Sequence, residues 1–360
     1  MNPERAVPCF LLLLALPGAM RAGQEAKPAE KPKLAGEIFK NVQVLKTLPE
    51  DQFWGTMSFF ADSLGVNCER CHATPFDADK KPEKIKARRM IRMVLDMNAR
   101  YFDGEQKVTC NSCHRGSTTP VAEPSLDAQR WQTFFQTEQP MPDGAGLIAR
   151  YRNLTGFAAA PAPRTERVSY EMTTYLSEAP PRKVETEVTV GGTDRFRMSR
   201  RGESGRQEWI RNGSSAWADD ANGWRAMERG EMFDISSEAS SFDWETLKDV
   251  TEPKTIKMDV ARGREAAVVE AKDHGERVWL YFDRGTGMLL RRRTFFPSYF
   301  ADGCWDVEFD DYRTVGRMKL PFLVQILNPS GNGLTIRKAR ERVPVRNLDA
   351  KLFTPPEGGK

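Results

Sequence analysis

The chain has 360 residues, a length typical of two domains, and a formal net charge of +4 at pH 7. Because basic and acidic residues are mixed along the chain, this charge does not indicate nucleic-acid binding. Of the six cysteines, one lies near the N-terminus, four lie in two short motifs and Cys304 stands alone, which excludes a disulfide framework.

Residues 1–23 have the pattern of a secretory signal peptide. Arg5 precedes the apolar run Ala6–Leu16, which is too short to span a bilayer, and small residues follow it. Met20 and Arg21 interrupt the expected cleavage pattern, so a retained membrane anchor is the alternative to cleavage. Residues 24–36 are rich in proline, alanine and charge and are predicted to form a flexible tether. We therefore expect a periplasmic protein, tethered to the membrane if the signal is retained.

Two copies of the motif Cys-x-x-Cys-His follow. The first copy contains Cys68, Cys71 and His72, and the second contains Cys110, Cys113 and His114. This spacing is the attachment signature of c-type haem: two thiols one helical turn apart form thioethers with the haem, and the histidine binds its iron. Structural zinc is the alternative, although zinc does not require histidine directly after the second cysteine in both copies. The motifs predict two covalently attached c-type haems.

A helix with an apolar face precedes the first motif. After a short predicted strand at Asn41–Leu45, a capping box at Thr47 to Glu50 starts the helix, which ends at Gly65. Its apolar face contains Phe53, Trp54, Met57, Phe60, Ala61 and Leu64.

Met57 on this face is a candidate for the sixth iron ligand. Thioether sulfur is a common axial ligand in cytochromes c, and the alternative for Met57 is ordinary core packing. The chain contains three histidines, of which His72 and His114 are already proximal ligands. The third, His274, is expected in a surface turn, so two distal histidine ligands are unavailable.

The second motif is also preceded by a predicted helix, from Pro82 to a point before Gly104. Three methionines share its apolar stripe, and periodicity does not choose between them as ligands. Basic residues near both motifs are candidates to pair with haem propionates, with a solvated helix face as the alternative. The stripe contains Met90, Met93, Val94, Met97 and Tyr101, and the basic candidates are Arg88, Arg89, Arg92 and Arg115.

Residues 39–116 resemble part of the cytochrome subunit of the photosynthetic reaction centre. The matching stretches are Lys40-Asn-Val-Gln-Val-Leu45, the helix Phe53…Met57, Ala87-Arg-Arg-Met-x-x-Met93 with Asn98, and Val108-Thr-Cys-x-x-Cys-His-Arg-Gly116. The resemblance implies that Met57 is the sixth ligand of the first haem, that Met90 is the sixth ligand of the second, and that Met93 packs beside the ring.

The chain also departs from this family. It carries two haem motifs where the family has four, its segment between Met57 and Cys68 is slightly shorter, and it lacks the family's histidine that serves another haem. These differences leave open whether the electron partner belongs to photosynthesis.

After a predicted linker at 119–142, the pattern changes. Asp143–Thr155 is expected to be a short helix, residues 230–249 are a further helical candidate, and from Arg164 alternating apolar residues separated by turn signals predict an antiparallel, strongly curved sheet. The segments 281–290 and 310–321 are similar to LolA-like half-barrels, which hold apolar chains. Examples of the expected strands are Val168–Tyr175, Val184–Val190, Ala266–Ala271, Arg277–Phe282, Met288–Phe296, Trp305–Asp310, Phe322–Leu327 and Thr335–Val343.

The sequence therefore predicts a multidomain protein, with an all-α dihaem cytochrome c domain at 37–118 and a mainly antiparallel β domain at 143–360. The leading function is one-electron transfer through two His/Met-ligated haems to a redox partner, with no catalytic residue. One alternative is a peroxidase-like haem enzyme or sensor with one open iron site. The other makes the β domain a module that binds an apolar ligand or a membrane-associated envelope partner, with the haem domain as its redox reporter.

Overall fold

The computed structural model describes residues 33–122, 140–159, 165–176, 179–192, 194–202, 205–220, 223–227, 244–328, 333–345 and 347–355. The predicted signal peptide lies outside the described residues, as do most of the tether, most of the linker and most of the expected helix at 230–249. No helix within the described stretches has the length and apolar character needed to cross a membrane.

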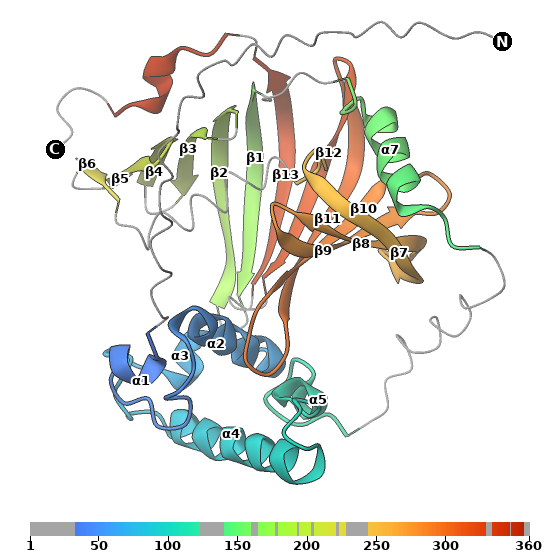
Figure 1. Cartoon of the computed structure of the whole chain (residues 1–360). Coiled ribbons are helices and arrows are strands. Elements are labelled where there is room, and N and C mark those ends of the chain that lie inside the picture. Colours follow the sequence, from blue (N-terminus) through green and yellow to red (C-terminus); the bar gives the residue numbers. More distant parts are fainter. Residues whose placement is uncertain are drawn as a thin grey trace, which may run out of the picture. The chain divides into compact units, whose positions relative to one another are not determined.

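The N-terminal part consists of helices joined by loops (Figure 1). Its two long helices carry the methionines, and the three short ones have four or five residues each. The prediction of an all-α domain is therefore confirmed only partly, because loops join most of these helices. The helices are α1 (Ala35–Ile38), α2 (Glu50–Leu64), α3 (Cys68–Cys71), α4 (Pro82–Tyr101) and α5 (Cys110–His114).

The two ends of α2 can be compared with the boundary signals predicted from the sequence. Gly65 ends the helix in the left-handed conformation, as predicted. The capping box at Thr47 is wrong, because Pro49 is the N-cap and no side chain caps this end. The strand predicted at Asn41–Leu45 is also wrong. Asn41 has a φ of 60°, and the chain turns back so that Gly36 donates a hydrogen bond to the carbonyl of Lys46.

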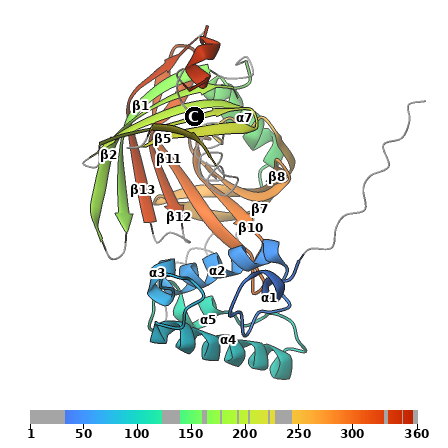
Figure 2. The same ribbon diagram turned by 90° about the vertical axis from the view of Figure 1, so that its left-hand side faces the viewer.

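The C-terminal part is an antiparallel sheet, which confirms the predicted sheet and enlarges it. Within the described residues it has 13 strands, and Figure 2 shows its strong curvature. The strands are β1 (Thr165–Leu176), β2 (Ala179–Gly191), β3 (Arg195–Gly202), β4 (Gly205–Asn212), β5 (Ser215–Asp220), β6 (Gly223–Ala226), β7 (Val250–Ala261), β8 (Arg264–Asp273), β9 (Glu276–Asp283), β10 (Leu289–Phe296), β11 (Gly303–Val315), β12 (Met318–Asn328) and β13 (Gly333–Pro344).

The strand order shows that the sheet is two meanders joined in the middle. It runs β6-β5-β4-β3-β2-β1-β13-β12-β11-β10-β9-β8-β7, so that the first strand pairs with the last. Short turns suffice for the other neighbours, because consecutive antiparallel strands need only a hairpin. A short 3-10 helix, Ala350–Phe353, follows β13 and places Phe353 in the interior.

The predicted helix at Asp143–Thr155 is present as α7 (Gly144–Thr155), with the Asp143 side chain capping its N-terminus. It packs against β7 and β12, and its Ile148 and Tyr151 enter the largest apolar cluster of the described residues, together with side chains of β8 to β12. Gly144 permits this close packing, because a Cβ there would lie 3.2 Å from the backbone nitrogens of Lys254 and Thr255.

A buried ion cluster ties the middle of the sheet to the segment before β7. Arg342 on β13 donates to Glu166 on β1 at 2.6 Å and to Glu245 at 2.9 Å. Their side chains are at most 4 % exposed. Tyr151 of α7 donates to the backbone carbonyl of Glu245 at 2.7 Å. Removing the arginine would leave two buried carboxylates without their cation, and such a loss is strongly destabilising.

We predict that Arg342→Met lowers the free energy of unfolding by about 3–5 kcal/mol. The matched control is Arg340→Met on the same strand. Arg340 pairs with Glu185, but its side chain is 60 % exposed, so its loss should cost less than about 1 kcal/mol. Urea unfolding of the haem-loaded protein measures both, and equal effects of the two variants would contradict the prediction.

Candidate haem-binding site

The first motif folds as a single helical turn. Asn67 caps α3 by accepting a hydrogen bond from the backbone nitrogen of Arg70, and the backbone nitrogen of His72 donates to the carbonyl of Cys68 at 2.9 Å. The turn brings Cys68 and Cys71 to the same side, because residues three apart are neighbours on a helix. Cys68 is exposed, Cys71 is half-buried, and both are free thiols.

The second motif has the same form with different end signals. Thr109 and Ser112 form a capping box at the start of α5, and Arg115 ends it in the left-handed conformation. Cys110 is half-buried and Cys113 is exposed. Burial raises the pKa of Cys110 to about 11 and also raises that of Cys71. In each motif one thiol therefore faces the protein and the other faces outward.

Both histidine rings are held in the same way by the backbone. Nδ1 of His72 lies 2.9 Å from the carbonyl oxygen of Phe76, and Nδ1 of His114 lies 2.8 Å from that of Ser117. A carbonyl can only accept, so Nδ1 carries the proton and Nε2 keeps its lone pair for a metal. The Phe76 ring also stacks on the His72 ring at a centroid distance of 5.2 Å. This arrangement fits an iron bound through Nε2.

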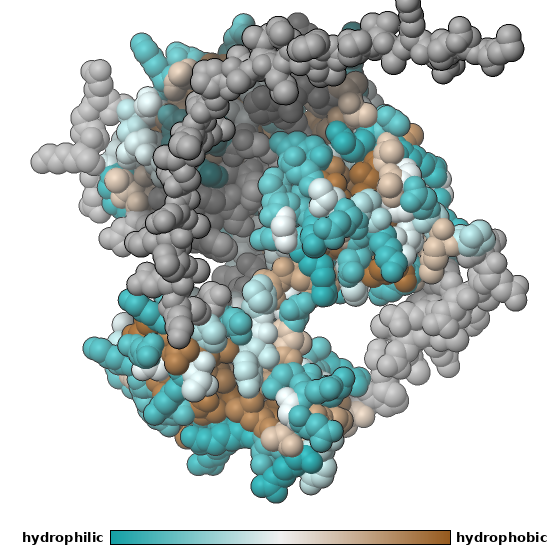
Figure 3. All heavy atoms as spheres, in the orientation of Figure 1, coloured by the Kyte–Doolittle hydropathy of each residue, from teal (hydrophilic) through white to brown (hydrophobic). Residues whose placement is uncertain are grey.

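Apolar side chains surround the motifs. Figure 3 shows hydrophobic residues gathered on the face of the helical part seen in that view. Met57 is partly buried against the helical core, while Met93 is 44 % exposed. A planar apolar cofactor would cover such a surface. The large exposed apolar side chains of this part are Ile38, Trp54, Phe76, Met93, Tyr101 and Phe102.

The two copies of this unit, each a methionine-bearing helix followed by a Cys-x-x-Cys-His turn, pack against each other. Helix α2 of the first copy packs against α5 of the second, and α3 of the first packs against α4 of the second. At one point of closest approach, Gly116 donates a backbone hydrogen bond to the carbonyl of Ser63 at 2.9 Å. A Cβ on Gly65 would lie 2.1 Å from the carbonyl oxygen of Gly116, so only glycine fits there.

Asn98 positions the second motif from the end of α4. Its side chain is 1 % exposed, accepts from the backbone nitrogen of Val108 at 2.9 Å and donates to the carbonyl of the same residue at 2.8 Å. It also donates to Gln106. Sequence reasoning noted Asn98 only as part of the family motif and missed this role.

The four arginines predicted as propionate partners differ in their surroundings. Arg88 is 9 % exposed and is engaged within the protein, where it donates to Asp79 at 2.9 Å and to the carbonyl of Asn41 at 3.1 Å. Its hydrogen bond lowers the pKa of Asp79 to about 2. Arg89, Arg92 and Arg115 are exposed. A propionate role for Arg88 would compete with its ion pair, whereas the other three are accessible.

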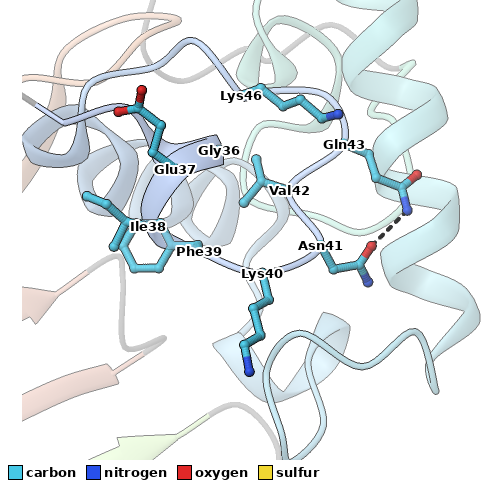
Figure 4. Close-up of a pocket in the computed structure, with 9 residues that line it drawn as sticks. All are labelled: Gly36, Glu37, Ile38, Phe39, Lys40, Asn41, Val42, Gln43 and Lys46. Carbon is cyan, nitrogen blue, oxygen red and sulfur yellow. Dashed lines mark hydrogen bonds between the residues drawn. The ribbon is translucent and has the colours of Figure 1, made fainter.

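A pocket of about 440 Å³ is a separate feature (Figure 4). The end of α1 and the loop after it, residues 36–43 with Lys46, line this pocket, and no residue of either motif does. Within the described stretches, no group of three or more His, Cys, Asp or Glu side chains lies close enough together to hold a metal ion. His274 stands in an exposed turn beside Asp273, as predicted.

A half-buried carboxyl lies close to the site. Asp62 of α2 has one oxygen buried with no hydrogen-bond partner among the residues that the structure describes, and burial raises its pKa from 3.8 to about 7. Burial chiefly raises the pKa of Cys304 on β11, and the negative charges of Asp306 and Asp62 add to this rise. The unfolded chain releases this proton at a lower pH than the folded chain does, so ionisation of Asp62 opposes folding.

We predict that stability falls as the pH rises from about 4 to 7, the interval between the two pKa values. Asp62→Asn should remove this fall and stabilise the protein at pH 8 by about 1–2 kcal/mol. This is less than the full difference between the two pKa values corresponds to, because solvent screens the partly exposed carboxyl. Urea midpoints at several pH values measure the effect. Asp96→Asn on the exposed face of α4 is the control, and a pH profile unchanged by Asp62→Asn would contradict the assignment.

The predicted family resemblance is confirmed by comparison. Residues 18–188 match the family model of the photosynthetic reaction centre cytochrome C subunit. Cytochrome c-554 of Chloroflexus aurantiacus is 38% identical over 85 residues, covering 21% of this chain and 20% of the relative. The reaction centre cytochrome c subunit of Rubrivivax gelatinosus is 31% identical over 168 residues, covering 44% of this chain and 40% of the relative. The chain thus spans two fifths or less of the length of these relatives.

Two solved structures align with more than half of this chain at low identity. A LolA superfamily protein from Nitrosomonas europaea aligns with 59% of this chain and 98% of its own length, at 10% identity and a TM-score of 0.43. A DUF1329 family protein from Desulfovibrio piger aligns with 60% and 98%, at 11% identity and a TM-score of 0.43.

Proposed function

We propose, from the match of residues 18–188 to reaction centre cytochrome c subunits, that this chain is an exported dihaem c-type cytochrome that transfers single electrons. The observation that carries the proposal is the repeated site geometry. Two Cys-x-x-Cys-His turns each present two thiols and an imidazole whose Nδ1 is hydrogen-bonded to a backbone carbonyl. This arrangement suits covalent haem attachment and an iron bond through Nε2.

Each residue type has a defined task in this proposal. The thiols of Cys68, Cys71, Cys110 and Cys113 anchor two haems, and His72 and His114 are the proximal ligands. Met57 and Met90 are the proposed sixth ligands, and a thioether there favours the reduced state and raises the reduction potential. When bound, each haem supplies an iron that takes up and releases one electron. The interlocked packing of α2 with α5 and of α3 with α4 supports two haems lying close together.

The location and partners follow from the same chemistry. The N-terminal signal pattern supports attachment and function on the periplasmic side, with a redox protein as donor or acceptor. We further propose that the sheet serves docking or apolar-ligand binding. Its support is a small pocket on the sheet between β1, β11, β12 and β13, whose apolar lining includes Val168, Tyr170 and Phe309.

The number of haems is tested by mass. The protein, expressed with haem-attachment machinery, should carry two covalent haems. Cys68→Ser with Cys71→Ser should leave one haem, and Cys110→Ser with Cys113→Ser should leave the other. The control is Cys304→Ser, which should keep both haems because Cys304 belongs to neither motif. Mass spectrometry of the intact chains decides, and one haem or none in the unmodified chain would contradict the dihaem proposal.

The methionine ligands are tested by optical spectra. Ferric haem bound by methionine has a weak absorption band at the red edge of the spectrum, and Met57→Ala and Met90→Ala should each remove about half of it. In the single-haem variants, Met57→Ala should abolish the band of the first haem, and Met90→Ala that of the second. Met93→Ala and Met97→Ala are matched controls on α4 that should leave the band in place.

Two results would favour the alternatives. A missing band in the unmodified protein, or a high-spin haem that binds carbon monoxide or peroxide, would indicate an open iron site and favour an enzyme or sensor. A different result would reassign the ligands. If Met57→Ala removes the band of the second haem instead of the first, Met57 binds the second iron and Met90 binds the first.

A further inference from the structure

One loop of the sheet reaches the helical core. Residues 297–302 join β10 to β11, and most of this loop is exposed. Phe300 is the exception, since it is 1 % exposed and belongs to the same apolar cluster as Leu48, Phe59 and Val94 of the helical part. An aromatic side chain at a loop tip is buried in this way only when another element covers it, and here the covering element is α2.

The contacts between this loop and α2 are of three kinds. The Phe300 ring lies 6.5 Å from the ring of Phe59 and 5.6 Å from the ring of Phe60, measured between centroids. The backbone nitrogen of Tyr299 donates to the hydroxyl of Thr56 at 3.1 Å. Thr56 is fully buried and donates in turn to the carbonyl of Gln52.

The third contact depends on a glycine. A Cβ on Gly55 would lie 2.2 Å from the carbonyl oxygen of Pro297, closer than any real side chain allows. Gly55 therefore lets the backbone of the loop lie against the backbone of the helix. Glycine weakens a helix interior, so its presence in the middle of α2 has a packing reason.

These contacts fix α2 next to Met57, the residue of this helix that is proposed to bind the first iron. Met57 follows Thr56 directly and packs against the same apolar cluster as Phe300. A helix fixed by a hydrogen bond, a backbone contact and a buried aromatic ring cannot easily rotate or slide. A ligand that is displaced by about 1 Å binds its metal more weakly.

We infer that the loop 297–302 braces α2, and that Phe300, Tyr299 and Pro297 are positioning residues for the Met57 ligand of the first haem. The inference rests on the proposed His/Met-ligated cytochrome and deepens it. It gives the fused sheet a role in the electron-transfer chemistry of one haem, through contacts made about 240 residues away in the chain.

The test isolates the first haem within the full chain. In a Met90→Ala background the red-edge band reports only on the iron bound by Met57. There, Phe300→Ala should weaken the band and lower the concentration of imidazole that displaces the methionine by about tenfold. The matched control is Phe309→Ala on β11, which is equally buried at 1 % exposure but packs in the core of the sheet.

A second variant keeps the test decisive if Phe300→Ala folds poorly. Gly55→Ala improves the intrinsic helix tendency of α2 but forces Pro297 away. The brace therefore predicts a weaker band and easier displacement by imidazole, whereas loss of helix stability alone predicts the opposite. In a Met57→Ala background, where only the second haem reports, neither variant should change the band by more than a small fraction.

The outcomes separate the two proposals. An absent band in the Met90→Ala protein, with both haems attached, means that the proposed His/Met ligation fails. A normal band that neither Phe300→Ala nor Gly55→Ala alters means that the ligation stands and the brace is wrong. Equal losses with Phe300→Ala and Phe309→Ala, or equal losses at both haems, also overturn the brace, because they show general destabilisation.

Discussion

A histidine binds iron through a ring nitrogen that carries no proton, so a haem protein must fix the tautomer of each proximal ring. In this chain a backbone carbonyl does so twice, at Phe76 for His72 and at Ser117 for His114. Both carbonyls are reached by a tight change of chain direction just after the motif. For the second motif that change is the left-handed Arg115, followed by Gly116 with a φ of 83°. The iron binding proposed for both motifs would therefore depend on backbone conformation as much as on the motif residues.

The helical part has little protein core of its own. Its buried apolar cluster contains Ala35, Leu45, Leu48, Phe59, Ile91, Val94 and Phe300, and the last of these comes from the sheet. Two bound haems would supply most of the apolar surface that such a small part lacks, because small domains bury too little surface to be stable alone. The interlocking of α2 with α5 and α3 with α4 then has a physical cause.

The sequence predicted the features that have local or periodic signals. Pro82 starts α4, Gly65 ends α2 and Asp143 caps α7. Seven of the eight expected strands lie within strands of the sheet, and the eighth begins one residue before β10. Strands β3 to β7 are not among the expected examples, because their alternation is less clear in the sequence. In β4 the buried positions include Glu208, which is 5 % exposed and is neutralised by Arg197 of β3 at 2.7 Å. The role of Phe300 could not be predicted at all, because it depends on a contact between segments far apart in the chain.

The asymmetry between the two sites gives the fusion a physical meaning. Helix α2 contacts the sheet through Gly55, Thr56 and Phe59, whereas α4 is tied to the second motif by Asn98. On the proposed function, two chemically identical iron sites are thus supported by different structures. The sheet would therefore act on the first iron site alone, through the backbone and the aromatic side chains of α2, without touching the iron.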